Sequence, residues 1–221
     1  SVTAIIPPST TSIADIPAAI GINPLTGLAL VAYQTAGIAS IIDLKKLPNP
    51  EVTGQVTVGT GATPRVAISP KLNWALITPG GAGNLTIVDL GRASTVATVT
   101  ISLSVTGVTI DDETQEAILV DPTGPPGMIF SLLDQTFKNV TGFPGAPPLG
   151  NLGGAFNPLA NMAVTVNKTD GTASVIDAAS PAVLTTFAVG TNPVDVAIDP
   201  GTNTAVIVNQ GSNNVSIFSL S

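Results

Sequence analysis

The stretch TNPVDVAIDPGTNTAVIVN, from Thr191 to Asn209, sets the pattern for the whole chain. Two apolar runs, Val194–Ile198 and Thr204–Val208, flank a turn that begins at Asp199. The same unit occurs five times, and its turns begin at Asn23, Ser69, Asp111, Asn157 and Asp199. Six residues after each start stands an alanine, at Ala29, Ala75, Ala117, Ala163 and Ala205. The starts are 46, 42, 46 and 42 residues apart, so the chain is built from repeats.

Each repeat contains several short apolar runs separated by turns. In the second repeat these are Ala67–Ile68, Trp74–Thr78, Leu85–Leu90 and Thr95–Ile101. Because the connections are short, they leave no room for crossover helices, and neighbouring strands must pair antiparallel. Four such strands in a period of this length are typical of a β-propeller blade.

The sequence therefore predicts an all-β chain, a five-bladed β-propeller of four-stranded antiparallel blades. The fifth repeat has only three runs, whereas an apolar SVTAII opens the chain. We expect this N-terminal strand to complete the last blade and close the ring, which would remove two exposed sheet edges. The rival interpretation is a piece of a propeller with six to eight blades. We predict a single domain over residues 1–221, with repeats at approximately 14–59, 60–104, 105–149, 150–190, and 191–221 plus 1–8.

Composition and charge bear on which partners and which location to expect. Seven basic against fourteen acidic residues give a net charge of −7, so nucleic acid is not an expected partner. No apolar run approaches the roughly 18 residues of a transmembrane helix, so we expect no membrane insertion. Low charge (10%) with abundant Thr, Ser, Asn, Gly and Ala is typical of a secreted or cell-surface protein. We expect the protein to be a monomer.

Two sets of repeated positions have structural explanations. The alanines are expected where one blade meets the next, because a larger side chain would overpack there. Twenty residues after the turn starts, short oxygen-bearing side chains are expected to accept backbone N–H groups of the following turn. These residues are Asp43, Asp89, Ser131, Asp177 and Ser219.

Several segments resemble the YVTN-type repeat propellers, which are akin to NHL and surface-layer repeats. The matching segments are VAIDP (196–200), VAISP (66–70), VTVN (164–167), VIVN (206–209), ASVID (173–177), NLTIVD (84–89) and ASIID (39–43). The resemblance implies a propeller, bacterial export and residence in larger surface proteins. It implies no single activity and no catalytic motif, and such propellers usually have more than five blades.

Candidate ligand-binding residues follow from an analogy with other propellers, whose ligands lie over the central channel. Arg65 and Asp195 are the only charges among the residues four positions before the turn starts, which should face that channel. The loops after the second strands add Tyr33, Asp121, Asn167 and Asn209. The alternative is that these side chains only satisfy their own loops.

Catalysis is disfavoured. The chain has no histidine and no cysteine, so it lacks an imidazole base, a thiol nucleophile and thiolate or imidazole metal ligands. Its three glutamates, Glu51, Glu113 and Glu116, fall on an outer strand or beside a turn, away from the expected ligand face. We therefore assign no catalytic residue. No metal site is assigned either, although the acidic run 111–113 and the loop 167–172 leave calcium open.

The sequence therefore predicts a non-catalytic binding or scaffolding module of an exported or cell-surface protein. Its partner would be a protein or a glycan whose identity the sequence does not give. The alternative is a carbohydrate-binding, lectin-like propeller. A propeller hydrolase or lyase comes third.

Overall fold

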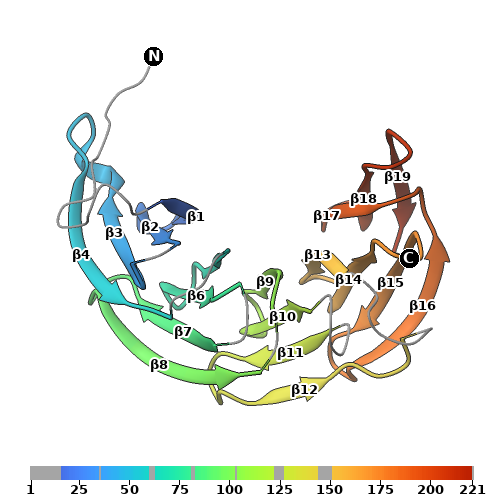
Figure 1. The fold of residues 1–221 in the computed structure, drawn as a ribbon, viewed down its shortest axis with the longest axis horizontal. Helices are drawn as coiled ribbons and strands as arrows, with labels where there is room; N and C mark the ends of the chain where they lie inside the picture. The colour runs from blue at the N-terminus through green and yellow to red at the C-terminus, as the bar shows by residue number, and fades with distance from the viewer. Residues whose placement is uncertain are drawn as a thin grey trace. The chain divides into compact units, whose positions relative to one another are not determined.

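The repeats become five antiparallel β-sheets that follow one another in chain order (Figure 1). The structure is a computed structural model, and it describes residues 16–34, 36–59, 63–80, 83–102, 104–121, 127–143 and 151–220. The chain divides into two units, Ser1–Ser102 and Leu103–Ser221, and each is described by itself. The expected single domain over residues 1–221 stays a prediction.

The first unit holds two four-stranded sheets, coloured blue to green in Figure 1. The first sheet consists of β1 (Pro17–Asn23), β2 (Leu28–Tyr33), β3 (Ile38–Asp43) and β4 (Glu51–Thr57). The second consists of β5 (Arg65–Ser69), β6 (Trp74–Thr78), β7 (Gly83–Asp89) and β8 (Ser94–Ile101). A 3-10 helix, η1 (Leu44–Lys46), follows β3.

The second unit holds three sheets, coloured green to red. The third sheet consists of β9 (Gly107–Asp111), β10 (Glu116–Val120), β11 (Met128–Ser131) and β12 (Phe137–Asn139). The fourth consists of β13 (Asn151–Asn157), β14 (Met162–Asn167), β15 (Thr172–Asp177) and β16 (Ala182–Ala188). The last sheet consists of β17 (Pro193–Asp199), β18 (Thr204–Asn209) and β19 (Asn214–Ser219).

The prediction of antiparallel sheets from the repeats is confirmed. In every sheet each strand pairs antiparallel with the next one along the chain. The last sheet has three strands among the described residues, as the sequence indicates. The expected closing strand at residues 1–8 lies outside the described residues, so ring closure stays a prediction.

The first hairpin of every sheet turns through a residue with left-handed backbone. This residue lies four positions after the turn start, a place that favours Gly or Asn, since they adopt positive φ most readily. The φ values are 71° at Gly27, 56° at Asn73, 60° at Gln115, 51° at Asn161 and 53° at Asn203. The shared conformation keeps the register between first and second strands the same from sheet to sheet.

Within each unit the core lies between consecutive sheets. Leu30 and Ile41 of the first sheet form one cluster with Ala75 and Ile77 of the second. The repeated alanines are at most 1% exposed, and Ala75, Ala163 and Ala205 belong to clusters that join two sheets. For these three alanines the predicted place between blades is confirmed, and Ala29 and Ala117 are buried as well.

A glycine marks the closest approach between the first two sheets. At Gly21 of β1, an added Cβ would lie 2.6 Å from Ile68 Cγ1 of β5. A side chain there would force apart sheets that pack at close van der Waals distance.

Candidate functional site

Three loops of the second unit form one hydrogen-bonded surface at the end of the fourth and last sheets. Val189 N donates to Gly171 O (2.8 Å), which ties the β16–β17 link to the β14–β15 loop. On the other side, Gln210 N donates to Asn192 O (3.0 Å) and Gly211 N to Thr191 O (2.9 Å). We call this the amide surface, and its exposed side chains are Thr169, Asp170, Thr191, Asn192, Gln210, Ser212 and Asn213.

Asn167 and Asn209, both predicted ligand residues, lie beneath the amide surface. They are 6% and 1% exposed. Asn167 Oδ1 accepts hydrogen bonds from Thr169 N (3.1 Å) and Asp170 N (3.3 Å). Asn209 Nδ2 donates to Asn214 Oδ1 and Ser216 Oγ, each at 2.9 Å. These two side chains therefore hold the loops in place, and the residues after them offer their polar groups to solvent.

Gly190 allows the β16–β17 link to lie close to the β18–β19 loop. A Cβ at Gly190 would lie 2.3 Å from Ser212 Oγ and 2.6 Å from Asn209 Cβ. Since real Cβ contacts are never that short, a larger residue would push the link away from the β18–β19 loop. The surface is thus continuous because residue 190 has no side chain.

The predicted acidic residues of this unit differ in exposure. Asp195, on β17, is exposed, and its Oδ1 accepts a hydrogen bond from Val196 N at 2.9 Å. Asp121, at the end of β10, is 3% exposed, and its Oδ2 accepts from Ser104 N at 3.2 Å. Asp121 therefore holds the link between β8 and β9, whereas the Asp195 side chain is exposed to solvent.

Arg65 and Tyr33 belong to the first unit. Arg65, on β5, is exposed, and its Nη1 donates to Pro64 O at 3.4 Å. Tyr33, at the end of β2, is 8% exposed. Arg65 and Asp195 lie in different units, so the joint polar site expected of them stays a prediction.

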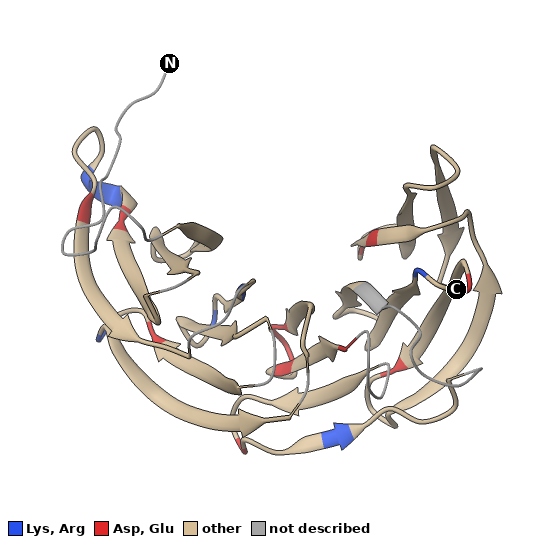
Figure 2. Cartoon of the chain, viewed as in Figure 1, with Lys and Arg blue, Asp and Glu red and all other residues tan. Residues whose placement is uncertain are grey.

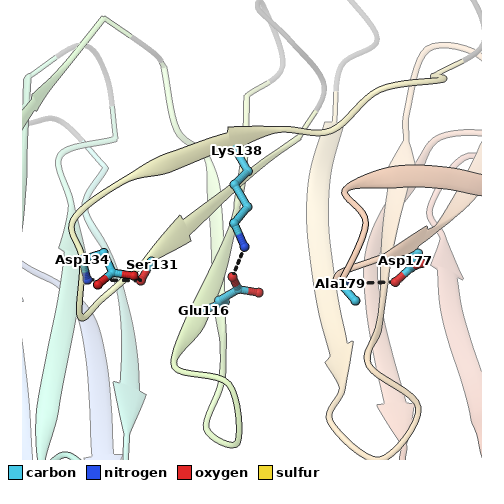
Figure 3. Close-up of polar contacts among 6 residues, drawn as sticks. All are labelled: Glu116, Ser131, Asp134, Lys138, Asp177 and Ala179. Atoms are coloured by element: carbon cyan, nitrogen blue, oxygen red, sulfur yellow. Dashed lines mark hydrogen bonds and ion pairs between the residues drawn. The ribbon is translucent and has the colours of Figure 1, made fainter.

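Charged side chains are scattered over the sheets (Figure 2). Glu116 and Lys138 pair across the third sheet, Nζ to Oε1 at 2.7 Å (Figure 3). Glu51 pairs with Lys46 at 2.5 Å, and this hydrogen bond raises the pKa of Lys46. Among the described residues, no three or more His, Cys, Asp and Glu side chains gather where they could hold a metal ion. No arrangement of acids for catalysis follows from these contacts.

In the first four sheets, oxygen-bearing side chains close the turns after the third strands, as predicted; for Ser219 this role stays a prediction. Asp177 Oδ1 accepts from Ala179 N (2.9 Å), and Ser131 Oγ accepts from Asp134 N (3.2 Å), as Figure 3 shows. Asp43 and Asp89 make the equivalent bonds in the first unit. Their role is to form turns.

A cavity of about 270 Å³ lies between the fourth and last sheets, and sequence reasoning missed it. Phe187 and Phe218 meet in it edge to face, with ring centroids 4.2 Å apart. The remaining lining is mainly apolar: Met162, Val175, Leu184, Thr185, Ser219 and Leu220. Phe187 and Phe218 lie in different sheets, on β16 and β19, so the repeat pattern does not predict their contact.

No protein-family model and no curated protein sequence matches the chain. Solved structures match its fold. Hydrazine synthase of Kuenenia stuttgartiensis matches with a TM-score of 0.75 and 16% identity, over 99% of this chain and 67% of that one. The β-propeller domain of Myceliophteria thermophila Cps50 (Swd1) matches with 0.71 and 11%, over 91% and 64%. A chain of the mitotic checkpoint complex matches with 0.76 and 17%, over 96% and 63%.

The chain has a β-propeller fold. The identities show the fold alone, because one propeller architecture serves many unrelated functions. The chain spans about two thirds of the chains that it matches. Among the described residues, no helix is both long and apolar enough to span a membrane.

Proposed function

We propose that this propeller is a non-catalytic binding or scaffolding module of an exported or cell-surface bacterial protein, with YVTN-type repeats. The amide surface carries the proposal. Three loops are fixed by backbone hydrogen bonds and by buried Asn167 and Asn209, so their exposed groups are presented without a large ordering cost on binding. A rigid scaffold that displays loops is the usual arrangement of a recognition surface.

A protein partner fits this surface best. Its amide and hydroxyl groups can pair with a partner's main chain and polar side chains, as in the polar parts of protein interfaces. The propeller fold supports this surface, and binding there needs no catalytic group. The absence of histidine and cysteine from the sequence favours binding over turnover.

A glycan ligand is the second candidate. The observation that favours it is the neutral character of the side chains from Gln210 to Asn213, which can both donate to and accept from sugar hydroxyls. No aromatic residue stands among the exposed side chains of the amide surface, so a sugar ring would lack a stacking platform there. Calcium is a further candidate ligand.

The test compares ligand binding by the intact chain with binding by Gln210→Ala/Asn213→Gly, where glycine keeps the positive φ of 56° at residue 213. Both residues are exposed, so the double variant removes surface groups without breaking the Asn209 bonds beneath. Ser180→Ala, exposed in the turn between β15 and β16, is the matched control. Melting temperatures are measured with neutral oligosaccharides, cell-wall polymers and CaCl₂. Binding to extracellular proteins of a bacterial culture is measured by biolayer interferometry.

Dose-dependent binding that the double variant loses and the control keeps would support the proposal. At a ligand concentration a hundred times the Kd, the native state gains about 2.7 kcal/mol. Stabilisation by an oligosaccharide, but by no protein fraction, would favour the glycan alternative. Turnover of a lactone or glycoside that Asp195→Ala abolishes would contradict the proposal and favour an enzyme.

A further inference from the structure

The boundary between the third and fourth sheets contains two buried oxygen atoms that have no hydrogen-bond partner among the described residues. They are Oδ2 of Asp111, at the end of β9, and Oδ1 of Asn161, in the turn between β13 and β14. Both residues belong to the second unit, and Asp111 is only 1% exposed. A buried carboxylate oxygen without a partner is costly, so this atom requires a donor or a cation.

The asparagine contacts at two other boundaries show which atom this place usually holds. Asn23 Nδ2 donates to Asn73 Oδ1 at 2.8 Å and to Pro70 O at 3.2 Å. Asn157 Nδ2 donates to Asn203 Oδ1 at 2.6 Å. At the turn start an amide nitrogen therefore meets oxygen atoms of the next turn.

In the third repeat a carboxylate oxygen replaces that nitrogen. Asp111 stands at the turn start, whereas the next turn keeps its oxygen acceptors, because Pro158 and Asn161 occupy the positions of Pro70 and Asn73. By this equivalence three oxygen atoms converge, one of them charged: Asp111 Oδ2, Asn161 Oδ1 and Pro158 O. Carboxylate, amide and backbone carbonyl oxygens are the ligands that calcium takes in proteins.

The sequence around this boundary offers few positive charges. Between Arg92 and Lys168 the only basic residue is Lys138, and it pairs with Glu116 at 2.7 Å. The two residues that follow Asp111 are acidic as well. A cation from solution can therefore supply the charge that neighbouring side chains do not.

The aspartate at the same repeat position of the last sheet differs in both respects. Asp199 is exposed, and its own turn uses both carboxylate oxygens: Gly201 N donates to Oδ1 at 3.0 Å and Thr202 Oγ1 donates to Oδ2 at 2.8 Å. In Asp111 only Oδ1 is used in this way, by Glu113 N at 2.8 Å. Burial and the remaining oxygen distinguish Asp111 from an ordinary turn aspartate.

We propose that Asp111 Oδ2, Asn161 Oδ1 and Pro158 O bind a calcium ion between the third and fourth sheets, with water completing the coordination. One carboxylate makes a weak site, so we expect a Kd of about 1 mM, as in extracellular calcium modules. Calcium competes with rotation of the Asn161 amide, which would satisfy the carboxylate in the ion-free protein. Asn161 precedes β14 and Asn167 ends it, so this site and the amide surface lie at opposite ends of that strand.

Thermal unfolding followed by circular dichroism tests the proposal, in CaCl₂ up to about 10 mM with NaCl holding the ionic strength constant. At roughly ten times the Kd, calcium should shift the folding equilibrium about tenfold toward the native state. For a chain of this size the melting temperature should rise by about 3–5 °C. Isothermal titration calorimetry of the folded protein measures the same binding directly.

Three variants locate the site. Asp111→Asn removes the charge and creates the asparagine pair of the other boundaries, so it should fold and lose the calcium response. Asn161→Gly removes a second ligand while keeping the positive φ of 51°, and it should weaken the response. Asp199→Asn makes the same change of charge at an exposed turn start, and this matched control should respond like the wild type.

Two results would overturn the proposal. The first is a wild-type melting temperature that CaCl₂ raises no more than NaCl of equal ionic strength, which would mean that the rotated Asn161 amide or water satisfies the carboxylate. The second is a calcium response that Asp111→Asn retains in full, which would assign the ion to another place such as the loop 167–172. Neither result bears on binding at the amide surface, which Gln210→Ala/Asn213→Gly tests separately.

Discussion

The hydrogen bonds of Asn157, including the one to Asn203, can be removed separately. The replacement residues are those that stand at the equivalent positions of other repeats. Asn157 is fully buried; its Oδ1 accepts from Leu159 N (3.1 Å) and Ala160 N (3.3 Å). Its Nδ2 donates to Asn203 Oδ1 at 2.6 Å. One side chain thus closes its own turn and joins the fourth sheet to the last.

Serine and glycine provide the perturbations. Ser69 stands at the equivalent turn start of the second sheet, where its Oγ accepts from Leu72 N at 3.2 Å. Asn157→Ser therefore keeps a turn bond and removes the contact with Asn203. Asn203→Gly removes the acceptor while keeping the positive φ of 53°, which Gly27 shares at the equivalent position.

The magnitudes follow from the number of bonds lost. A net hydrogen bond contributes about 0.5–1.5 kcal/mol, so Asn157→Ala, which loses three, should destabilise by about 2–4 kcal/mol. Asn157→Ser loses two of the three bonds and should cost about 1–3 kcal/mol. The loss of unfolding free energy in the double variant Asn157→Ser/Asn203→Gly should be about 1 kcal/mol smaller than the sum of the two single losses, because the two side chains share one hydrogen bond.

Urea unfolding followed by circular dichroism measures these differences. With a slope of about 2 kcal/mol per molar urea, a coupling of about 1 kcal/mol corresponds to a midpoint difference of about 0.5 M. The slope itself should stay constant across the set. If the single variants add to within about 0.3 kcal/mol, the two asparagines do not stabilise each other and the reasoning is wrong.

Two further predictions concern packing and pH. Ala205→Leu, at a fully buried position between sheets, should destabilise by about 1–3 kcal/mol, whereas Ala197→Leu on the exposed face of the same sheet should change stability by less than about 0.5 kcal/mol; thermal unfolding checks both. Hydrogen bonds from Thr202 Oγ and from Gly201 N lower the pKa of Asp199. The stabilisation of the folded state by ionised Asp199 should therefore be complete above the pKa of an unfolded aspartate. It should be lost as pH drops through the lower pKa of the folded state. Asp199→Asn should flatten that acid limb of the stability curve, and an unchanged curve would count against these bonds.

The fold was largely predictable because its information is local and repeated. The spacing of the turn starts fixed the number of sheets, and short connections fixed antiparallel pairing. The strand at Trp74–Thr78 was predicted with the bounds that the structure has. The third sheet was the hardest to predict, since β11 (Met128–Ser131) and β12 (Phe137–Asn139) are the shortest strands. Strands of three or four residues offer little alternation on which strand prediction depends.

The candidate site was less predictable, because exposure depends on hydrogen bonds that close within each loop. Asn167 and Asn209 have the right chemistry for ligand binding, yet both are buried and satisfy loop or strand groups. The exposed side chains are their neighbours, such as Gln210 and Asn213, whose sequence pattern does not differ from that of any polar turn. Nor could the pattern reveal the close approach at Gly190, which requires knowing that two loops meet.

The turn positions also show how a repeat protein adjusts one boundary without changing its plan. At the boundary between the third and fourth sheets, the two positions that form asparagine contacts elsewhere hold Asp111 and Asn161. Asp111 is 1% exposed, and its Oδ2, like Oδ1 of Asn161, is buried without a hydrogen-bond partner. The repeat pattern assigns these two oxygens to the asparagine contact, where rotation of the Asn161 amide would present Nδ2 to the carboxylate for a charge-assisted hydrogen bond. Oδ1 of Asp111 already accepts a hydrogen bond from Glu113 N at 2.8 Å. Because a buried carboxylate oxygen without a hydrogen bond is costly, we expect this boundary to tolerate substitution of Asn161 less than the asparagine pairs do.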